Sequence, residues 1–312
     1  MVEMIEPYKG RVYDPACGSG GMFVMSENLY RNTKVTSKTS QSIMNLAIRN
    51  INNINSQFVA WNTEGSFLKD AYPDLKADYI LANPPFNQSD WGQEILQDDA
   101  RWKYGVPPAG NANFGWMQHM LYHLAPHGVM ATVLANGSLS SNTSGEGEIR
   151  KKLIENNLIE CIVALPKQLF YNTGIPACIW FLRRERKTRK NEILFIDASE
   201  MGYLEDRLHR VLAEEDINKI SDTYHNWRKN PDNYKDIQGF CKSAQRDEVE
   251  KHGFVLTLGR FVGIKDAIDD GVPFEEKMKK LTSTLKEQFA KEELMNAEIK
   301  KQLAKIGFSF DI

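Results

Sequence analysis

Short apolar runs alternate with amphipathic segments up to about residue 198. The runs are rich in residues that fit a buried pleated sheet, so they predict strands at 11–14, 77–83, 129–136, 158–166, 177–184 and 192–198. Other segments repeat apolar residues at helical spacing and predict helices at 21–30, 42–51, 113–128, 145–157 and 214–227. This alternation predicts an α/β fold with a doubly wound, mostly parallel sheet and helices on both faces.

The remainder of the chain has a different pattern. Residues 199–272 are polar and mixed, and a long charged helix follows Pro273. We therefore expect a core over 1–198, an appended region over 199–272 and a C-terminal helical tail over 273–312. The tail carries an apolar stripe at spacings of three and four, formed by Phe274, Met278, Leu281, Leu285 and Phe289. Such a stripe packs either on its own domain or on the helices of a partner, and the pattern favours neither.

Composition narrows the class of protein. The 312 residues are 42% hydrophobic and 26% charged, which is typical of a globular protein. No apolar run is long enough to span a membrane, and the N-terminus lacks the basic start of a signal peptide. We expect a cytoplasmic protein without a membrane partner. Its cysteines form no C-x-x-C pair, which predicts reduced, buried thiols.

The charge balance bears on nucleic-acid binding. The net charge is −2, whereas a protein that holds DNA alone usually has a strong basic excess. If this chain acts on DNA, a partner is expected to supply much of the binding. The basic run RRERKTRK (183–190) is expected to be the solvated tip of a hairpin, with phosphate contact as the alternative.

The stretch DPACGSGG (14–21) follows the first predicted strand and opens a predicted helix. Its glycines let the backbone approach a ligand closely, and the free N–H groups of a following helix point at that ligand. An acid ahead of the glycines suits a cofactor with a cationic amino-acid end and no phosphate, such as S-adenosylmethionine. A plain tight turn is the alternative. The candidate cofactor-binding residues are Asp14, Pro15, Ala16, Cys17, Gly18, Ser19 and Gly20.

The strand predicted over 77–83 leads into the candidate catalytic residues Asn83, Pro84, Pro85 and Phe86. The side-chain oxygen of Asn83 and the carbonyl of Pro84 can accept hydrogen bonds from a planar exocyclic amine, and the prolines preorganise these acceptors. Phe86 offers a face for a flipped base, worth about 1–3 kcal/mol. A rigid loop is the alternative. Parallel sheets bind ligands beyond the carboxyl ends of their strands, so we expect Asp14 and Asn83 at one rim.

Two other site chemistries fit the sequence less well. Methyl transfer to cytosine C5 needs a Pro-Cys nucleophile, and Cys17 follows Ala16 instead. His119 and His123 lie four apart on a predicted helix, but no third ligand is near them in the sequence, so no metal site is expected. The loop over 102–114 is expected to line the base pocket or a DNA channel.

DPACGSGGMF (14–23) together with LANPPFN (81–87) resembles the motif pair of N6-adenine DNA methyltransferases. The stretches over 98–128, 135–153 and 164–182 are similar to the modification subunit of type I restriction-modification systems. The resemblance runs from about residue 3 to the C-terminus. It implies a Rossmann-like methyltransferase fold, S-adenosylmethionine as cofactor and adenine N6 in DNA as the methyl acceptor.

The resemblance also implies partners and exposes departures. It implies a separate DNA-specificity subunit, a restriction (nuclease and translocase) subunit and two modification subunits in each complex. The family's N-terminal helical domain and its Thr-Pro segment have no counterpart here, and residues 31–45 lack the acid that holds the ribose. Glu64 and Asp70 are candidates for an acid at the base edge. A truncated, impaired subunit is one expectation; a catalytically inactive remnant that only docks the specificity subunit and a protein-glutamine methyltransferase are the alternatives.

Overall fold

The computed structural model describes most of the chain beyond residue 72 and short parts before it. The described residues are 1–8, 10–16, 22, 25, 68, 70, 72–170, 173–264, 273–305 and 307. The chain divides into two compact units, Met1–Lys265 and Asp266–Ile312. The expected boundaries at 198 and 272 stay predictions.

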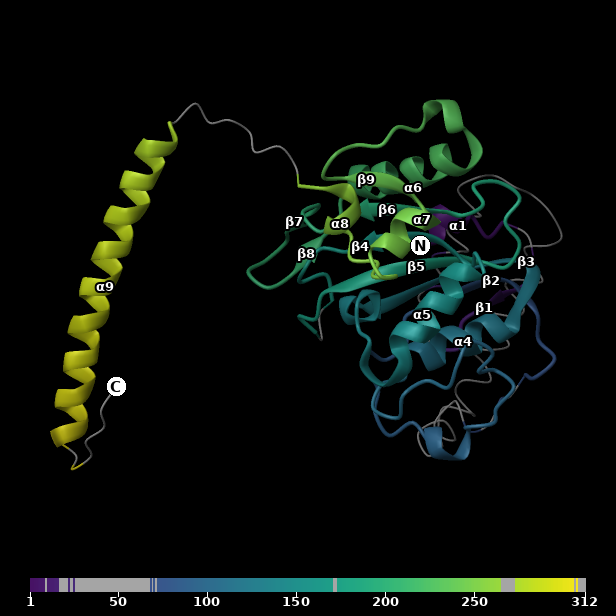
Figure 1. Cartoon of the computed structure of the whole chain (residues 1–312), viewed down its shortest axis with the longest axis horizontal. Helices are drawn as coiled ribbons and strands as arrows, with labels where there is room; N and C mark the ends of the chain where they lie inside the picture. Colours follow the sequence, from purple (N-terminus) through teal and green to yellow (C-terminus); the bar gives the residue numbers. More distant parts are fainter. Residues whose placement is uncertain are drawn as a thin grey trace. The chain divides into compact units, whose positions relative to one another are not determined.

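The first unit is built on a seven-stranded sheet (Figure 1). Its strands are Val12–Tyr13 (β1), Ala77–Ala82 (β2), Leu124–Ala135 (β3), Ile159–Ala164 (β4), Ala177–Arg183 (β5), Glu192–Asp197 (β6) and Cys241–Gln245 (β9). They lie in the order β1-β2-β3-β5-β4-β6-β9. The pairs β1–β2, β2–β3 and β4–β6 are parallel, whereas the three other pairs are antiparallel. The α/β fold is confirmed, with a mixed sheet.

Helices cover both faces of this sheet. The described helices of the first unit are Val2–Ile5 (α1), Asn113–His123 (α4), Glu146–Glu155 (α5), Glu214–Lys229 (α6), Arg246–Lys251 (α7) and Gly259–Val262 (α8). One buried cluster joins the sheet to α4, α5, α7 and α8, and a second joins it to α1 and α6. The central strand β5 shows why: Trp180 belongs to the first cluster and Phe181 to the second, because successive side chains point to opposite faces.

Smaller elements complete the first unit. Short 3₁₀ helices cover Gln93–Ile95 (η1), Asn136–Leu139 (η2), Thr143–Gly145 (η3) and Pro231–Asn233 (η4). Tyr203–Leu204 (β7) and Arg210–Val211 (β8) form a separate antiparallel hairpin. No helix in the described parts of the chain is long and apolar enough to cross a membrane. The described cysteines Cys161, Cys178 and Cys241 are free and buried, as expected.

Most predicted elements appear, but one helix ends earlier than expected. The pattern predicted a helix over 113–128, whereas α4 ends at His123 and Leu124 is already extended. Pro126 disfavours a helical conformation at the residue before it, so the chain leaves the helix ahead of the proline. The predicted helices over 21–30 and 42–51 fall outside the described residues, apart from Met22 and Met25.

The basic run over 183–190 is not the tip of a hairpin. It joins β5 to β6, and these strands lie on either side of β4 instead of pairing with each other. Arg186 is 5% exposed and donates hydrogen bonds to the Ile159 carbonyl and the Asn157 side chain. Its guanidinium also lies 5.7 Å from the centre of the Trp227 ring. Part of this run therefore has a structural role in the connection between β5 and β6, because the Arg186 guanidinium binds a buried carbonyl and packs on an aromatic ring.

The second unit is described over one long helix, α9, which spans Phe274–Lys305. The helix predicted after Pro273 is confirmed. Its apolar residues are exposed, including Phe274, Met278, Leu281, Leu285 and Phe289. An isolated helix buries little of its own apolar surface, so this unit alone gives the stripe no core.

Candidate active site

The two sequence motifs follow neighbouring parallel strands. β1 pairs with β2 in parallel, with Tyr13 opposite Ile80. Asp14 comes directly after β1, and Asn83 comes directly after β2. The carboxyl ends of paired parallel strands lie at the same edge of a sheet, so both residues stand at one rim, where α/β folds bind their ligands.

Asp14 is a buried carboxyl at this rim. It is 8% exposed, and its Oδ1 accepts a hydrogen bond of 2.9 Å from the backbone N–H of Ala16. Burial raises the pKa of Asp14 to about 7, although the hydrogen bond from Ala16 works in the opposite direction. Pro15 is also buried. A buried carboxylate gains most from a nearby cation, so the group suits a ligand with a positive charge. Cys17, Gly18, Ser19 and Gly20 lie outside the described residues.

The segment after β2 presents both exposed and buried groups. Asn83 and Pro85 are exposed, Pro84 is buried and Phe86 is partly buried. The Phe86 ring meets the ring of Phe170 edge to face, with centroids 5.8 Å apart. Phe170 follows β4, and nothing in its spacing indicated that it would reach Phe86. The sequence therefore gave no sign of this residue, which adds a second aromatic ring beside Phe86.

The loop over 102–112 packs back on α4. Gln118 is 1% exposed. Its Oε1 accepts a hydrogen bond of 2.9 Å from the backbone N–H of Tyr104, and its Nε2 donates one of 2.8 Å to the carbonyl of Gly105. One side chain thus satisfies both a donor and an acceptor of the loop backbone. Its placement beside DNA or a base stays a prediction.

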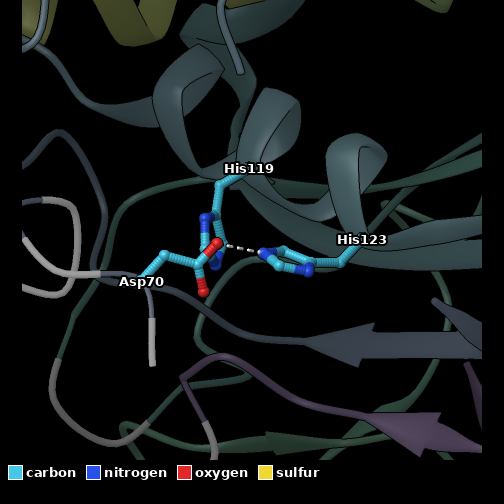
Figure 2. A group of neighbouring side chains, drawn as sticks. All are labelled: Asp70, His119 and His123. Carbon is cyan, nitrogen blue, oxygen red and sulfur yellow. Dashed lines mark ion pairs between the residues drawn. The ribbon is translucent and has the colours of Figure 1, made fainter. Parts of the chain in front are cut away.

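The partly buried Asp70 lies beside the buried His119 and His123 and forms a polar group with them (Figure 2). One ligand atom from each of the three lies within 4.8 Å of the others. The Asp70 carboxylate is thus a third polar group beside the two histidines, which the sequence did not reveal. Oδ2 of Asp70 lies 3.0 Å from Nε2 of His123, the pair joined by the dashed line in Figure 2. Asp70 was also a candidate for the base edge, and that role stays a prediction; Glu64, the other candidate, lies outside the described residues.

Arg101 determines which ring nitrogen of His119 accepts a hydrogen bond. The guanidinium only donates, and its Nη1 lies 3.1 Å from His119 Nδ1, which therefore accepts. Burial, with the nearby charges of His123 and Arg101, lowers the pKa of His119 to about 3, so the ring is neutral and carries its proton on Nε2. A protonated nitrogen cannot ligate a metal. This geometry favours a hydrogen-bonded polar network over a three-ligand metal site.

Other charges hold this network in place. Asp99 accepts from Arg101 at Nε and Nη2, both at 2.7 Å, so the guanidinium is fixed by a bidentate pair. The backbone carbonyl of Leu75 lies 3.1 Å from His123 Nδ1, which must donate to it. The hydroxyl of Tyr13 lies 3.4 Å from His119 Nε2. The network thus joins β1, α4 and the loop that begins after η1.

Comparison with known proteins extends the sequence resemblance. Residues 1–270 match the family model described as N-6 DNA Methylase. The chain is 52% identical over 321 residues to the type I restriction enzyme HindI methylase subunit of Haemophilus influenzae, with 99% of this chain and 71% of that protein covered. It is 40% identical over 329 residues to the MjaIX methylase subunit of Methanocaldococcus jannaschii, with 99% and 58% covered.

Solved structures agree on the fold. The type I restriction-modification methyltransferase subunit from Streptococcus thermophilus superposes with a TM-score of 0.66 at 23% identity, over 84% of this chain and 56% of that chain. The EcoKI M protein gives a TM-score of 0.60 at 16% identity, over 99% and 74%. The chain thus spans only part of the length of each relative.

Proposed function

Because the chain belongs to the N-6 DNA methylase family, among the methylase subunits of type I restriction enzymes, we propose that it transfers a methyl group from S-adenosylmethionine to adenine N6 in DNA. The observation that carries this proposal is the parallel pairing of β1 with β2, which puts Asp14 and the Asn83–Phe86 segment at one rim. The adenine amine and the methyl donor would meet there.

Asn83 and Pro84 hold the amine in this proposal. The side-chain oxygen of Asn83 and the backbone carbonyl of Pro84 accept from its two N–H groups, which draws the nitrogen lone pair out of the ring. The fixed φ angles of the prolines keep both acceptors in place during the reaction. Neither role needs a metal ion or a covalent bond to the protein.

Phe86 and Phe170 form the walls for the base. An adenine flipped out of the duplex would stack on Phe86, whose exposed fraction leaves room for contact, and would meet the Phe170 ring at an angle. Stacking on an aromatic side chain is worth about 1–3 kcal/mol and offsets part of the cost of flipping. The two rings also exclude water from the reacting nitrogen.

Asp14 receives the cationic end of the cofactor. The cofactor supplies an electrophilic methyl group on a positively charged sulfur. The buried carboxyl of Asp14 has a raised pKa because its charge is poorly solvated, and a bound cation would stabilise the ionised form. The glycine turn would hold the rest of the cofactor through its backbone.

The proposed enzyme works in the cytoplasm within a complex. A net charge of −2 suits a subunit that acts on DNA held partly by others. In our proposal a DNA-specificity subunit reads the target, a restriction subunit cleaves, and two methylating subunits are present. The exposed apolar residues of α9 provide a surface for the helices of the specificity subunit.

The test is methyl transfer by a reconstituted complex of this chain with its specificity subunit. Labelled methyl groups from S-adenosylmethionine should enter adenine N6 of unmethylated duplex DNA. Asn83→Ala should lower the rate by about 10²–10³-fold, as the loss of one preorganised polar group in an active site does. Asn156→Ala, at an exposed asparagine on the end of α5, is the matched control. Full-speed methylation by Asn83→Ala would refute the mechanism.

A catalytically inactive remnant is the second candidate function, favoured by the absence of an acid over residues 31–45. Calorimetry separates it from the enzyme: binding of S-adenosylmethionine at micromolar concentration contradicts the remnant. Retained association with the specificity subunit without cofactor binding supports it. A glutamine-containing peptide offered beside duplex DNA tests the third possibility, methylation of protein glutamine.

A further inference from the structure

The turn that follows Phe86 is tied to the first residue of α4. Asn87 has a φ of +51°, a left-handed conformation that asparagine adopts more readily than most residues. Its backbone N–H donates to Oδ1 of Asn113 at 3.0 Å, and its side-chain Oδ1 accepts from Nδ2 of Asn113 at 2.9 Å. These two hydrogen bonds, here called the amide clamp, use both ends of the Asn113 amide.

The Asn113 side of the clamp is buried in the protein core. Asn113 is 1% exposed, although asparagine is usually a surface residue. Its own backbone N–H donates to Asn111 Oδ1 at 3.0 Å, which satisfies one of the free donors at the start of α4. A buried amide with donor and acceptor both engaged holds its partner in one orientation, because either bond breaks when the partner rotates.

Neighbouring bonds prevent the turn from moving away. The carbonyl of Gln88 accepts from the N–H of Ala112 at 2.9 Å, and its side-chain Oε1 accepts from Nε1 of Trp116 at 3.2 Å. The two residues after Phe86 are therefore each bonded to α4 or to the residue before it. The proline pair stiffens the segment on one side of Phe86, and α4 fixes it on the other.

We propose that Asn113 is a positioning residue that sets the direction of the Asn83–Phe86 segment for methyl transfer. This inference rests on the proposed function, since it gives the segment a reaction to serve. Asn113 itself touches neither the base nor the cofactor. It acts through Asn87, by keeping Phe86 and the acceptors ahead of it in reach of the flipped adenine.

The reaction is sensitive to such positioning. Direct attack needs the reacting atoms about 3–3.5 Å apart and aligned, and a displacement of about 1 Å can lower a rate by about 10²-fold. Loss of the clamp should therefore lower kcat, whereas the KM for S-adenosylmethionine should not change, because Asp14 follows a different strand.

Two substitutions at one position separate the clamp from simple packing. Asn113→Leu keeps the shape of the side chain and removes both hydrogen bonds. Asn113→Asp keeps an acceptor for the Asn87 N–H, and the Asn87 amide can turn to donate to the second oxygen. A carboxylate is also favoured at the first turn of a helix. We expect Asn113→Leu to lower kcat by about 10–100-fold and Asn113→Asp to restore it to within about threefold of the unchanged complex.

The experiment uses the complex with the specificity subunit and duplex DNA, and reports kcat, KM for S-adenosylmethionine and the fluorescence of 2-aminopurine at the target adenine. Asn113→Leu should lower kcat and the flipping signal at constant KM. Asn87→Gly keeps the positive φ but removes part of the same contact, so adding it to Asn113→Leu in a double variant should lower kcat little further. Asn156→Ala is the control. Thermal unfolding of each variant identifies loss of folding.

The outcomes separate the two claims. If the unchanged complex does not methylate DNA, the proposed function fails and the positioning role fails with it. If the unchanged complex methylates DNA but Asn113→Leu keeps its kcat, the positioning role alone fails. An equal loss in Asn113→Leu and Asn113→Asp, or a loss that appears in KM for the cofactor, also overturns it.

Discussion

Helices α6 and α9 carry similar apolar patterns but use them differently. On α6 the apolar residues Ile220, Tyr224 and Trp227 are buried against the sheet. On α9 the corresponding stripe is exposed, with Leu281 and Leu285 at 63% and 49%. The contrast shows that periodicity identifies an apolar face but does not say what covers it. The face of α6 stabilises its own fold, and we propose that the face of α9 stabilises a complex.

Among the variants that test this contrast, Trp227→Ala should have the largest effect, on the free energy of unfolding. The side chain is fully buried, and its Nε1 donates to Ser243 Oγ at 2.8 Å. Removing a buried tryptophan costs about 3–5 kcal/mol in the free energy of unfolding. Chemical denaturation of the isolated chain measures this. Leu281→Ala on α9 is the counterpart and should change the same quantity by less than about 0.5 kcal/mol. Equal effects would contradict the contrast.

Leu285→Glu should weaken association with the specificity subunit by about 10–100-fold, because a buried interface contact becomes an unpaired charge. Ser283→Glu introduces the same charge two positions away, on another face of the helix, and should have little effect. Surface-immobilised specificity subunit gives both dissociation constants. If the two variants bind equally well, the stripe is not the docking face.

The pH dependence of cofactor binding should show a smaller effect, at the rim. The pKa of Asp14 is raised to about 7 when no cofactor is bound. The protonated carboxyl therefore stabilises the folded state at low pH, and this stabilisation is lost as the pH rises through about 7. A bound cation reverses the preference. Affinity for S-adenosylmethionine should therefore fall by up to about tenfold for each pH unit below about 7. Calorimetry should find this slope missing in Asp14→Asn.

Phe170→Ala should have the smallest effect, because it removes one aromatic wall and leaves Phe86 in place. An edge-to-face pair is worth about 0.5–1.5 kcal/mol, so methylation should slow by about 3–10-fold. Phe170→Leu, which keeps much of the apolar area, should slow it less. Single-turnover methylation of duplex DNA by the complex measures both rates, and an unchanged rate in Phe170→Ala would remove Phe170 from the proposed pocket.

Residue types and their spacing were sufficient for much of this protein. Apolar runs predicted β1 to β6, although β9 was not predicted, and the stripe after Pro273 predicted α9. The two motifs after β1 and β2 predicted a methyl-transfer site. Each of these predictions depends on residues close together in the chain. The family followed from these motifs together with the stretches over 98–128, 135–153 and 164–182. Local patterns also explain the one early helix end, since Pro126 acts on its immediate neighbours.

Only the tertiary structure brought together residues that are distant in the chain. Strand order placed the basic crossover after β5 beside Trp227, and the packing of separate loops brought Phe170 to Phe86 and Asp70 to His123. The amide clamp between Asn87 and Asn113 is of the same kind. Such contacts depend on which elements pair across the sheet, and a hydrogen bond between distant segments leaves no periodic signal in a single sequence.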